Sequence, residues 1–256
     1  MRISELKSAA KKMIAPHKSA LYKASALILV LEIIFLGLSI ILDLTNHEDA
    51  ADNIGYIGDL LIYPVILANI AMIAKIYQGK DIESRDSLAN YSTIRLFGKA
   101  LAAYILPGIY VFLWTLPFVV ISICSFIPVY LNHSTNPLLV VVFIVSLLIS
   151  IIIAIIKGLQ YGLNPYILGA DNTVTVNQSI KLSKDLMKGY KWKMFLLTLS
   201  FIGWFFLVPF TLGIILIWLI PYYNATVYEF YNHIKSNTVT SEQNTEEIVE
   251  DSTTEK

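Results

Sequence analysis

The chain carries no Asp, Glu, Lys or Arg between Ala100 and Ile156. A helix that crosses the hydrocarbon core of a bilayer needs roughly 20 apolar residues, so this stretch is too long for one crossing and long enough for two. The polar segment at 131–137 is the expected turn between them. With 56% hydrophobic and only 15% charged residues over 256 positions, the chain has more apolar surface than a soluble core can bury. The sequence therefore predicts a membrane protein.

Four further apolar stretches complete the expected membrane domain. The first runs from 24 to 42, and the second lies between Asp59 and Lys75. The charge-free stretch from 194 to 228 is too long for a single span, because a straight helix of that length extends about 50 Å. We predict that it forms a short hairpin that turns near 209–211, with a re-entrant pair as the alternative. The predicted fold is all-α, a polytopic bundle of six transmembrane helices.

The basic residues indicate how this bundle lies in the membrane. All 19 Lys and Arg residues fall in the N-terminal segment, in the second and fourth loops, or in the C-terminal tail. Because Lys and Arg near spans are retained on the cytoplasmic side, we predict a multi-pass protein of the cell membrane with both termini in the cytoplasm. The expected parts are a basic amphipathic N-terminal segment (1–23), a six-span membrane domain (24–235) and an acidic tail (236–256) that we expect to be disordered.

Two segments have the pattern of amphipathic cytoplasmic helices. In the fourth loop, between 174 and 188, apolar residues recur on one helical face and lysines lie on the other, with Asp171 or Asn172 as the expected N-terminal cap. We predict that this helix lies in the inner interface with its apolar side toward lipid; a soluble helix packed on the loop between spans two and three is the alternative. The candidate residues for binding anionic lipid or a partner protein are Lys181, Lys184, Lys188 and Lys191. The N-terminal segment repeats the pattern more weakly at Ile3, Leu6, Ala10 and Met13, either as a second interfacial helix or as a basic leader that only sets the topology.

No motif in the sequence predicts catalysis. The four His residues are far apart, the single Cys124 lies in an apolar run, and neither a phosphate loop nor a Gly-x-Ser-x-Gly motif occurs. We therefore predict a protein that is not an enzyme and has no metal, cofactor or nucleic-acid partner. Glu32 is the residue that most needs an explanation, because it lies about 13 Å of helix beyond Lys23, where an unpaired carboxylate is costly. Asn69 on the second span is its candidate partner, and the pair forms either a proton or cation site or a polar clamp between two helices.

Several motifs in the C-terminal half carry a family resemblance. They are Met187-Lys188-Gly189-Tyr190-Lys191, Leu199-Ser200-Phe201-Ile202-Gly203-Trp204, Thr211-Leu212-Gly213-Ile214 and Pro221-Tyr222. With these motifs the chain resembles the bacterial membrane-protein family catalogued as domain of unknown function 975. This resemblance implies a polytopic protein of the Gram-positive cell membrane with no established activity. More distantly, the chain looks like the membrane domain attached to some glycerophosphodiester phosphodiesterases, whose catalytic part is a separate soluble barrel that we expect this chain to lack.

Two main hypotheses about function follow from these observations, and a lipid-processing enzyme is a third. In the first, the protein is an accessory or self-protection protein of the envelope that uses its basic inner surface to engage anionic lipid or a membrane protein partner. In the second, it is a small transporter or transporter subunit with Glu32 and Asn69 at a cavity near the middle of the membrane.

Overall fold

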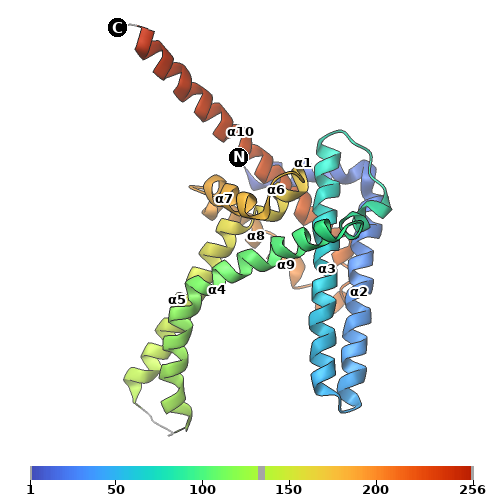
Figure 1. Cartoon of the computed structure of the whole chain (residues 1–256), viewed down its shortest axis with the longest axis vertical. Coiled ribbons are helices and arrows are strands. Elements are labelled where there is room, and N and C mark those ends of the chain that lie inside the picture. Colours follow the sequence, from blue (N-terminus) through green and yellow to red (C-terminus); the bar gives the residue numbers. More distant parts are fainter. Residues whose placement is uncertain (1, 132–135, 255–256) are drawn as a thin grey trace.

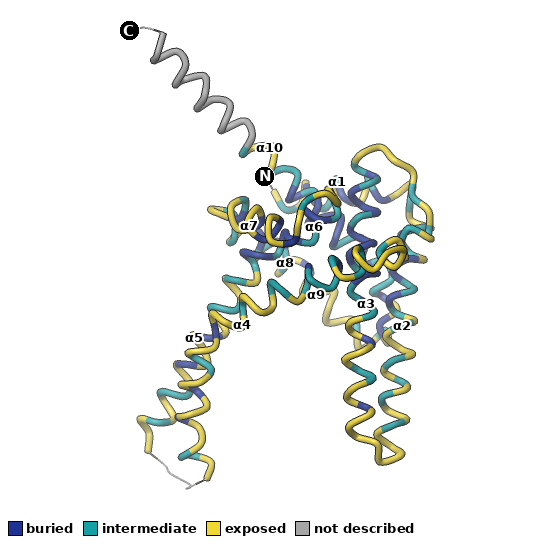
Figure 2. The backbone as a smooth tube through the Cα atoms, viewed as in Figure 1, coloured by how far each residue is buried: buried dark blue, intermediate teal, exposed yellow. Residues whose placement is uncertain are grey.

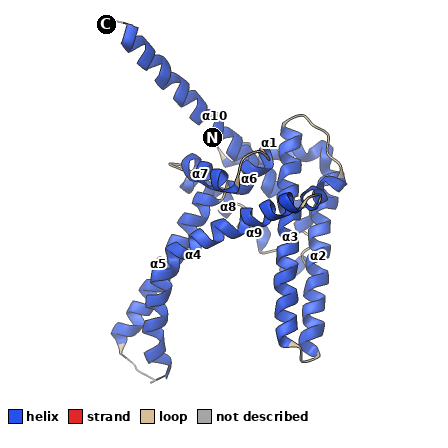
Figure 3. Ribbon diagram, viewed as in Figure 1, coloured by secondary structure: helices blue, strands red, loops and turns tan. Residues whose placement is uncertain are grey.

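The computed structural model describes residues 2–131 and 136–254, with side chains described through residue 238. Within these ranges the protein is built of helices and contains no β-strand (Figure 3). The first half comprises α1 (Ile3–Ile14), the 3-10 turn η1 (Ala15–His17), α2 (Lys18–Leu44), α3 (Glu48–Tyr77), the 3-10 turn η2 (Ser84–Tyr91) and α4 (Ile94–Leu131). The second half comprises α5 (Pro137–Tyr161), α6 (Asn164–Ala170), α7 (Val176–Leu186), α8 (Lys191–Leu199), α9 (Ile202–Phe205), the 3-10 turn η3 (Pro209–Thr211) and α10 (Leu216–Thr254).

Two long helical hairpins diverge from a common upper region, in which α1, α6, α7 and the first turns of α10 gather (Figure 1). One hairpin pairs α2 with α3 and the other pairs α4 with α5. Along both hairpins, large apolar side chains such as Ile34, Leu36, Val141 and Ile152 are exposed (Figure 2). Apolar surface of this extent requires a cover other than water, and lipid supplies one. Four helical stretches are long and apolar enough to cross a membrane: Ile3–Leu44, Glu48–Tyr77, Ile94–Leu131 and Pro137–Ala170.

Helix α3 is the central helix of the molecule. In its most apolar stretch 61% of the residues are buried, against 11% to 17% in the other three candidate spans. Its upper half joins α1, α6 and α10 in the main apolar core, which includes the fully buried Phe230 and Ile234 of α10. The upper region therefore has a protein core of its own, whereas the hairpins depend on their surroundings to cover them.

The N-terminal helix α1 packs on protein. Leu6, Ala10 and Ile14 recur every four residues on one face, and all three are buried where α1 contacts α10. Lys7 Nζ donates a hydrogen bond to the carbonyl oxygen of Ser200 at 2.9 Å and lies 4.0 Å from the centre of the Phe201 ring. This packing differs from the expected interfacial helix, because the apolar side of α1 faces α10 rather than a lipid surface, whereas the role of the segment in setting the topology stays a prediction.

The region expected to form spans five and six is broken into short pieces. Between 191 and 215 the structure contains only α8, α9 and η3, and the chain reverses at Leu212 and Gly213, whose φ angles are 48° and 80°. The reversal therefore lies beside Pro209–Thr211, where the sequence predicts a turn. Neither this region nor α10 is among the four candidate spans, so the fifth and sixth crossings stay a prediction.

Helices extend into two polar segments of the sequence. The acidic residues between the first two apolar stretches belong to helices, because α2 extends to Leu44 and α3 already begins at Glu48. Glu48 and Asp49 lie in the first turn of α3, where the helix dipole favours negative charge. Helix α10 continues into the acidic tail as far as Thr254, and the disorder expected from residue 236 onward stays a prediction. That segment contains no Pro or Gly, and extending an existing helix is far less costly than nucleating a new one.

Candidate functional site

Three carboxylates line a cleft between α2 and α3. Glu32, Asp52 and Asp59 all border this space of about 320 Å³, together with Ser39. The charges of Glu32 and Asp59 are close enough to interact. No Lys, Arg or His is among the described residues that line the cleft. A group of acids without a basic neighbour suits a proton or a cation, which is the chemistry expected of an ionisable site inside a membrane.

Asn69 does not line this acidic cleft. Its side-chain amide donates to the carbonyl oxygen of Val65 at 3.2 Å in its own helix, and its Oδ1 is buried without a hydrogen-bond partner among the described residues. Asn69 is ten residues from Asp59, which corresponds to about 15 Å along α3. The expected pairing of Glu32 with Asn69 is therefore not formed. The sequence pattern places Asp59 at the end of the second span, but α3 continues past it to Glu48, so Asp59 lies beside the second half of α2.

The N-terminus of α7 is capped by a residue that sequence reasoning did not choose. Thr175 forms a capping box with Gln178, because the Thr175 hydroxyl accepts from the Gln178 amide and the Gln178 side chain accepts from the Thr175 amide. Asp171 instead accepts hydrogen bonds from the Thr173 hydroxyl at 2.6 Å and the Thr173 amide at 2.8 Å. These bonds, with the nearby charges of Lys99 and Lys235, lower the pKa of the Asp171 carboxyl.

Helix α7 packs its inner face on the junction of α5 and α6. Ser179 Oγ donates to the side-chain oxygen of Asn164. Ser183 Oγ donates to the carbonyl oxygen of Gln160 at 3.0 Å and accepts from the backbone amide of Leu163 at 3.1 Å. Val176, Ser179, Ile180 and Ser183 are all buried on this face. This face of α7 lies against protein rather than lipid, as the packed-helix alternative expects, but its contacts are mainly with α4, α5 and α6 rather than with the loop between α3 and α4.

The candidate lysines project from the outer side of this region. Lys181, Lys184 and Lys188 are exposed, and Lys188 forms a surface ion pair of 2.9 Å with Asp185. That pairing lowers the pKa of Asp185. Of the apolar residues assigned to the lipid-facing side, Leu182 is exposed, whereas Met187 is buried in the main core. The outer surface of α7 is therefore mainly cationic.

Sequence reasoning missed a fifth lysine that lies beside this group. Lys157 of α5 places its ammonium 3.5 Å from the centre of the Trp114 ring of α4. Lys191 Nζ donates to Gln160 Oε1 at 3.4 Å, and Lys157 lies close enough to Lys184 and Lys191 for their charges to repel. Lys157 lies far from the other two in sequence, so only the packing of α5 against α7 and α8 brings the three together.

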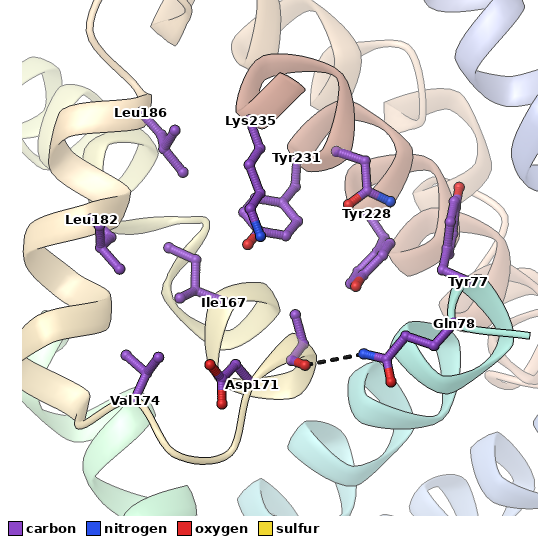
Figure 4. Close-up of a pocket in the computed structure, with 12 residues that line it drawn as sticks. Tyr77, Gln78, Ile167, Asp171, Val174, Leu182, Leu186, Tyr228, Tyr231 and Lys235 are labelled. Carbon is purple, nitrogen blue, oxygen red and sulfur yellow. Dashed lines mark hydrogen bonds between the residues drawn. The ribbon is translucent and has the colours of Figure 1, made fainter. Parts of the chain in front are cut away.

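A second cavity of about 480 Å³ lies between the end of α3, the α6–α7 segment and α10 (Figure 4). Tyr77 and Tyr228 form one wall with ring centres 4.6 Å apart, and Leu182 and Leu186 lie on the opposite side. The side-chain amide of Gln78 donates to the Ala170 carbonyl oxygen at 3.2 Å beneath it. The lining also includes Asp171 and Lys235, so the cavity combines an aromatic wall with one acid and one base.

The fold and its four long apolar helices are those of a helical membrane protein. Among the described residues, no group of three or more His, Cys, Asp or Glu side chains is arranged to hold a metal ion. The chain belongs to the family described as protein of unknown function (DUF975), whose model matches residues 1–238. No curated protein and no solved structure matches the chain. The more distant resemblance to phosphodiesterase membrane domains therefore gains no support.

Proposed function

We propose that this protein is a non-enzymatic accessory protein of the cell membrane that binds anionic lipid head groups through its basic inner surface, in envelope maintenance or self-protection. We place α7 and both termini on the cytoplasmic side, because the tips of the two hairpins, near 45–47 and 131–137, contain no Lys or Arg. In this arrangement the segment from α8 to the start of α10 provides the fifth and sixth crossings as a short hairpin. A membrane protein partner that binds the same basic surface fits this role too.

The observation that carries this proposal is the outer surface of α7. Its inner face is occupied by the protein's own contacts, so its lysines are not needed to hold the helix in place. A lysine near an anionic membrane surface contributes roughly 1 kcal/mol of attraction. With Asp185 offsetting one charge, Lys181, Lys184, Lys188 and Lys191 together supply about 3 kcal/mol, which is roughly a hundredfold preference for an anionic surface.

The test uses the full chain in phosphatidylcholine bilayers that contain spin-labelled phosphatidylglycerol or spin-labelled phosphatidylcholine. Electron spin resonance then measures which lipid is immobilised at the protein surface. We expect a preference for phosphatidylglycerol that falls severalfold in the Lys181→Glu/Lys184→Glu/Lys188→Glu variant and survives in the matched Lys→Arg variant. Raising the salt from 0.1 M to 1 M should also weaken it, because the Debye length shrinks from about 10 Å to about 3 Å. An unchanged preference in the Glu variant contradicts the proposal.

A second candidate function is proton or cation transport through the cleft between α2 and α3. The observation that favours it is the position of Asp59 beside Glu32, with no basic residue among the described lining. Proteoliposomes that hold a pH-sensitive dye would report proton flux across the bilayer. Transport predicts that Glu32→Gln and Asp59→Asn each abolish the flux and that Asn69→Ala, on the same helix as Asp59, retains it. Flux that is equal in all four proteins, or absent from the wild type, rejects this function.

A further inference from the structure

An apolar groove of about 390 Å³ separates α5 from α8 and α9. Gly158 and Leu159 form its α5 side, and Phe195, Leu199 and Ile202 form the opposite side. The lining is aliphatic and aromatic except for Thr198, whose hydroxyl lies 3.4 Å from the Tyr223 hydroxyl. Gly158 is exposed, and a Cβ atom built on it meets no atom within 4 Å. The groove is therefore open at Gly158 rather than closed by a neighbouring side chain.

The basic cluster of Lys157, Lys184 and Lys191 lies at one end of this groove. On α8, Lys191 is followed after four residues by Phe195 and after eight by Leu199, so the three share one helical face. On α5, Gln160 directly follows Leu159, and Lys191 Nζ reaches its Oε1 across the gap between the two helices. Lys157 directly precedes Gly158, and its charge interacts with those of Lys184 and Lys191. Asp185, the acid next to Lys184, is already paired with Lys188.

The three lysines lie at a depth that corresponds to the boundary between the hydrocarbon core and the lipid head groups. Lys157 lies twenty residues after Pro137, which is about 30 Å along α5 and matches the thickness of a bilayer core. Trp192 is 67% exposed and stacks on Phe195 with ring centres 5.3 Å apart. Exposed Trp is typical of the interfacial layer. A lipid whose head group lies at this level therefore has an apolar channel running from its phosphate along α8.

We propose that the groove and the cluster form a binding site for one anionic glycerophospholipid. Its phosphate contacts the ammonium groups of Lys157, Lys184 and Lys191, and one acyl chain lies against Gly158, Phe195 and Leu199. Three neighbouring cations favour a lipid with net negative charge, whereas a choline head group adds a further cation to them. This site deepens the proposed lipid-binding function and rests on it, because it replaces general attraction to a charged surface with one defined position.

The test uses the full chain in detergent, to which phosphatidylglycerol or phosphatidylcholine is added before native mass spectrometry counts the retained lipids. Gly158→Phe fills the groove without meeting a neighbouring atom at its Cβ. Gly108→Phe is the matched control, because Gly108 is also an exposed helical glycine with open space at its Cβ, but it lies on α4 outside the groove. We expect the wild type and Gly108→Phe to retain one phosphatidylglycerol with at least tenfold preference over phosphatidylcholine. Gly158→Phe and Lys157→Gln/Lys191→Gln should each lose that preference tenfold, with thermal midpoints equal to that of Gly108→Phe.

Each other outcome overturns the site in a recognisable way. If Gly158→Phe retains phosphatidylglycerol as the wild type does, the groove holds no acyl chain. If inorganic phosphate displaces the lipid equally from the wild type and from Gly158→Phe, the lysines bind phosphate without a lipid chain. In both cases the wider lipid-binding function still stands as long as the Lys181→Glu/Lys184→Glu/Lys188→Glu variant loses its preference in the bilayer experiment. Loss of the defined site and loss of the function are therefore separate results.

Discussion

The hydrogen bond between α6 and α4 permits a demanding test of how this fold is held together. Pro107 has no amide proton, so the carbonyl oxygen of Ala103, four residues earlier in α4, lacks its usual helical donor. The side-chain amide of Asn164 donates to that oxygen, and the Asn164 side-chain oxygen accepts from Ser179. Asn164 and Ser179 are both 0% exposed, so water does not readily replace either bond. Asn164 thus compensates for the proline and fixes α7 with the same side chain.

We expect Asn164→Ala to lower the free energy of unfolding by about 2–4 kcal/mol. An unsatisfied buried carbonyl costs about 1–3 kcal/mol, and the lost bond with Ser179 adds roughly 1 kcal/mol. Pro107→Ala restores an amide proton that can bond to the Ala103 oxygen within α4. Asn164→Ala should therefore destabilise the Pro107→Ala variant by roughly 1–2 kcal/mol less than it destabilises the wild type. This difference is the coupling energy of a double-mutant cycle.

The assay is unfolding of the full chain by dodecyl sulfate in mixed micelles, followed by circular dichroism. The four proteins of the cycle are the wild type, the two single variants and the double variant. Pro117→Ala is the control background, because this proline also lies inside α4 but is not four residues after Ala103. It should leave the cost of Asn164→Ala unchanged. A coupling energy below about 0.5 kcal/mol in the Pro107→Ala background would refute the reasoning, because that is the scatter expected of independent sites.

Three further predictions concern charge, packing and the N-terminal helix. Hydrogen bonds from Thr173 lower the pKa of Asp171 in the folded protein. The ionised Asp171 therefore stabilises the fold above its ordinary pKa near 4, and this stabilisation is lost as the pH falls through the lowered pKa. Asp171→Asn should remove this part of the fall in the thermal midpoint at acid pH. Gly58→Leu should disrupt the α2–α3 hairpin and lower the thermal midpoint, because a Cβ atom at Gly58 comes within 2.6 Å of the Phe35 ring. Gly55→Leu should leave the thermal midpoint nearly unchanged, because a Cβ atom at Gly55 meets no atom within 4 Å. Lys7→Met should lower the free energy of unfolding by about 1 kcal/mol, because it removes the hydrogen bond and the ring contact that attach α1 to the α8–α9 junction. The same dodecyl sulfate titration measures this loss.

The sequence predicts the helical class and the first two hairpins because a membrane narrows the choice of structure. Lipid offers no hydrogen bonds to the backbone, so a long apolar run must form helices, and it can turn only where polar residues return. The run from 100 to 156 accordingly becomes α4 and α5, separated at the polar segment after Leu131. The same reasoning fails between 191 and 215. From Met194 onward that region contains no charged residue, so hydropathy does not reveal that the backbone divides into α8, α9 and η3.

The partner of Glu32 was missed for a different physical reason. Along the sequence, the depth of a residue in the membrane follows from its distance to the nearest charged residue of its own segment, and this distance places Asp59 at the edge of the second span. Neighbouring helices, however, are aligned by their packing, and in this hairpin Phe35 fills the space that Gly58 leaves open. That register brings Asp59 to the cleft that contains Glu32. Such an alignment depends on contacts between two helices and cannot be deduced from the spacing within either one.

The cluster of Lys157, Lys184 and Lys191 shows what topology alone leaves unexplained. Retention of a loop in the cytoplasm requires Lys or Arg near the ends of the spans, but it does not require those residues to approach one another. Bringing three cations together is unfavourable, and the one acid adjacent to them in α7 is paired with Lys188 instead. The fold nevertheless holds Lys157 against Trp114 and Lys191 against Gln160, which keeps both charges at the end of an apolar groove. Lysines that are held close together in a defined position are the arrangement expected of a site that binds an anion. The apolar groove beside them is the reason to expect that this anion carries an acyl chain.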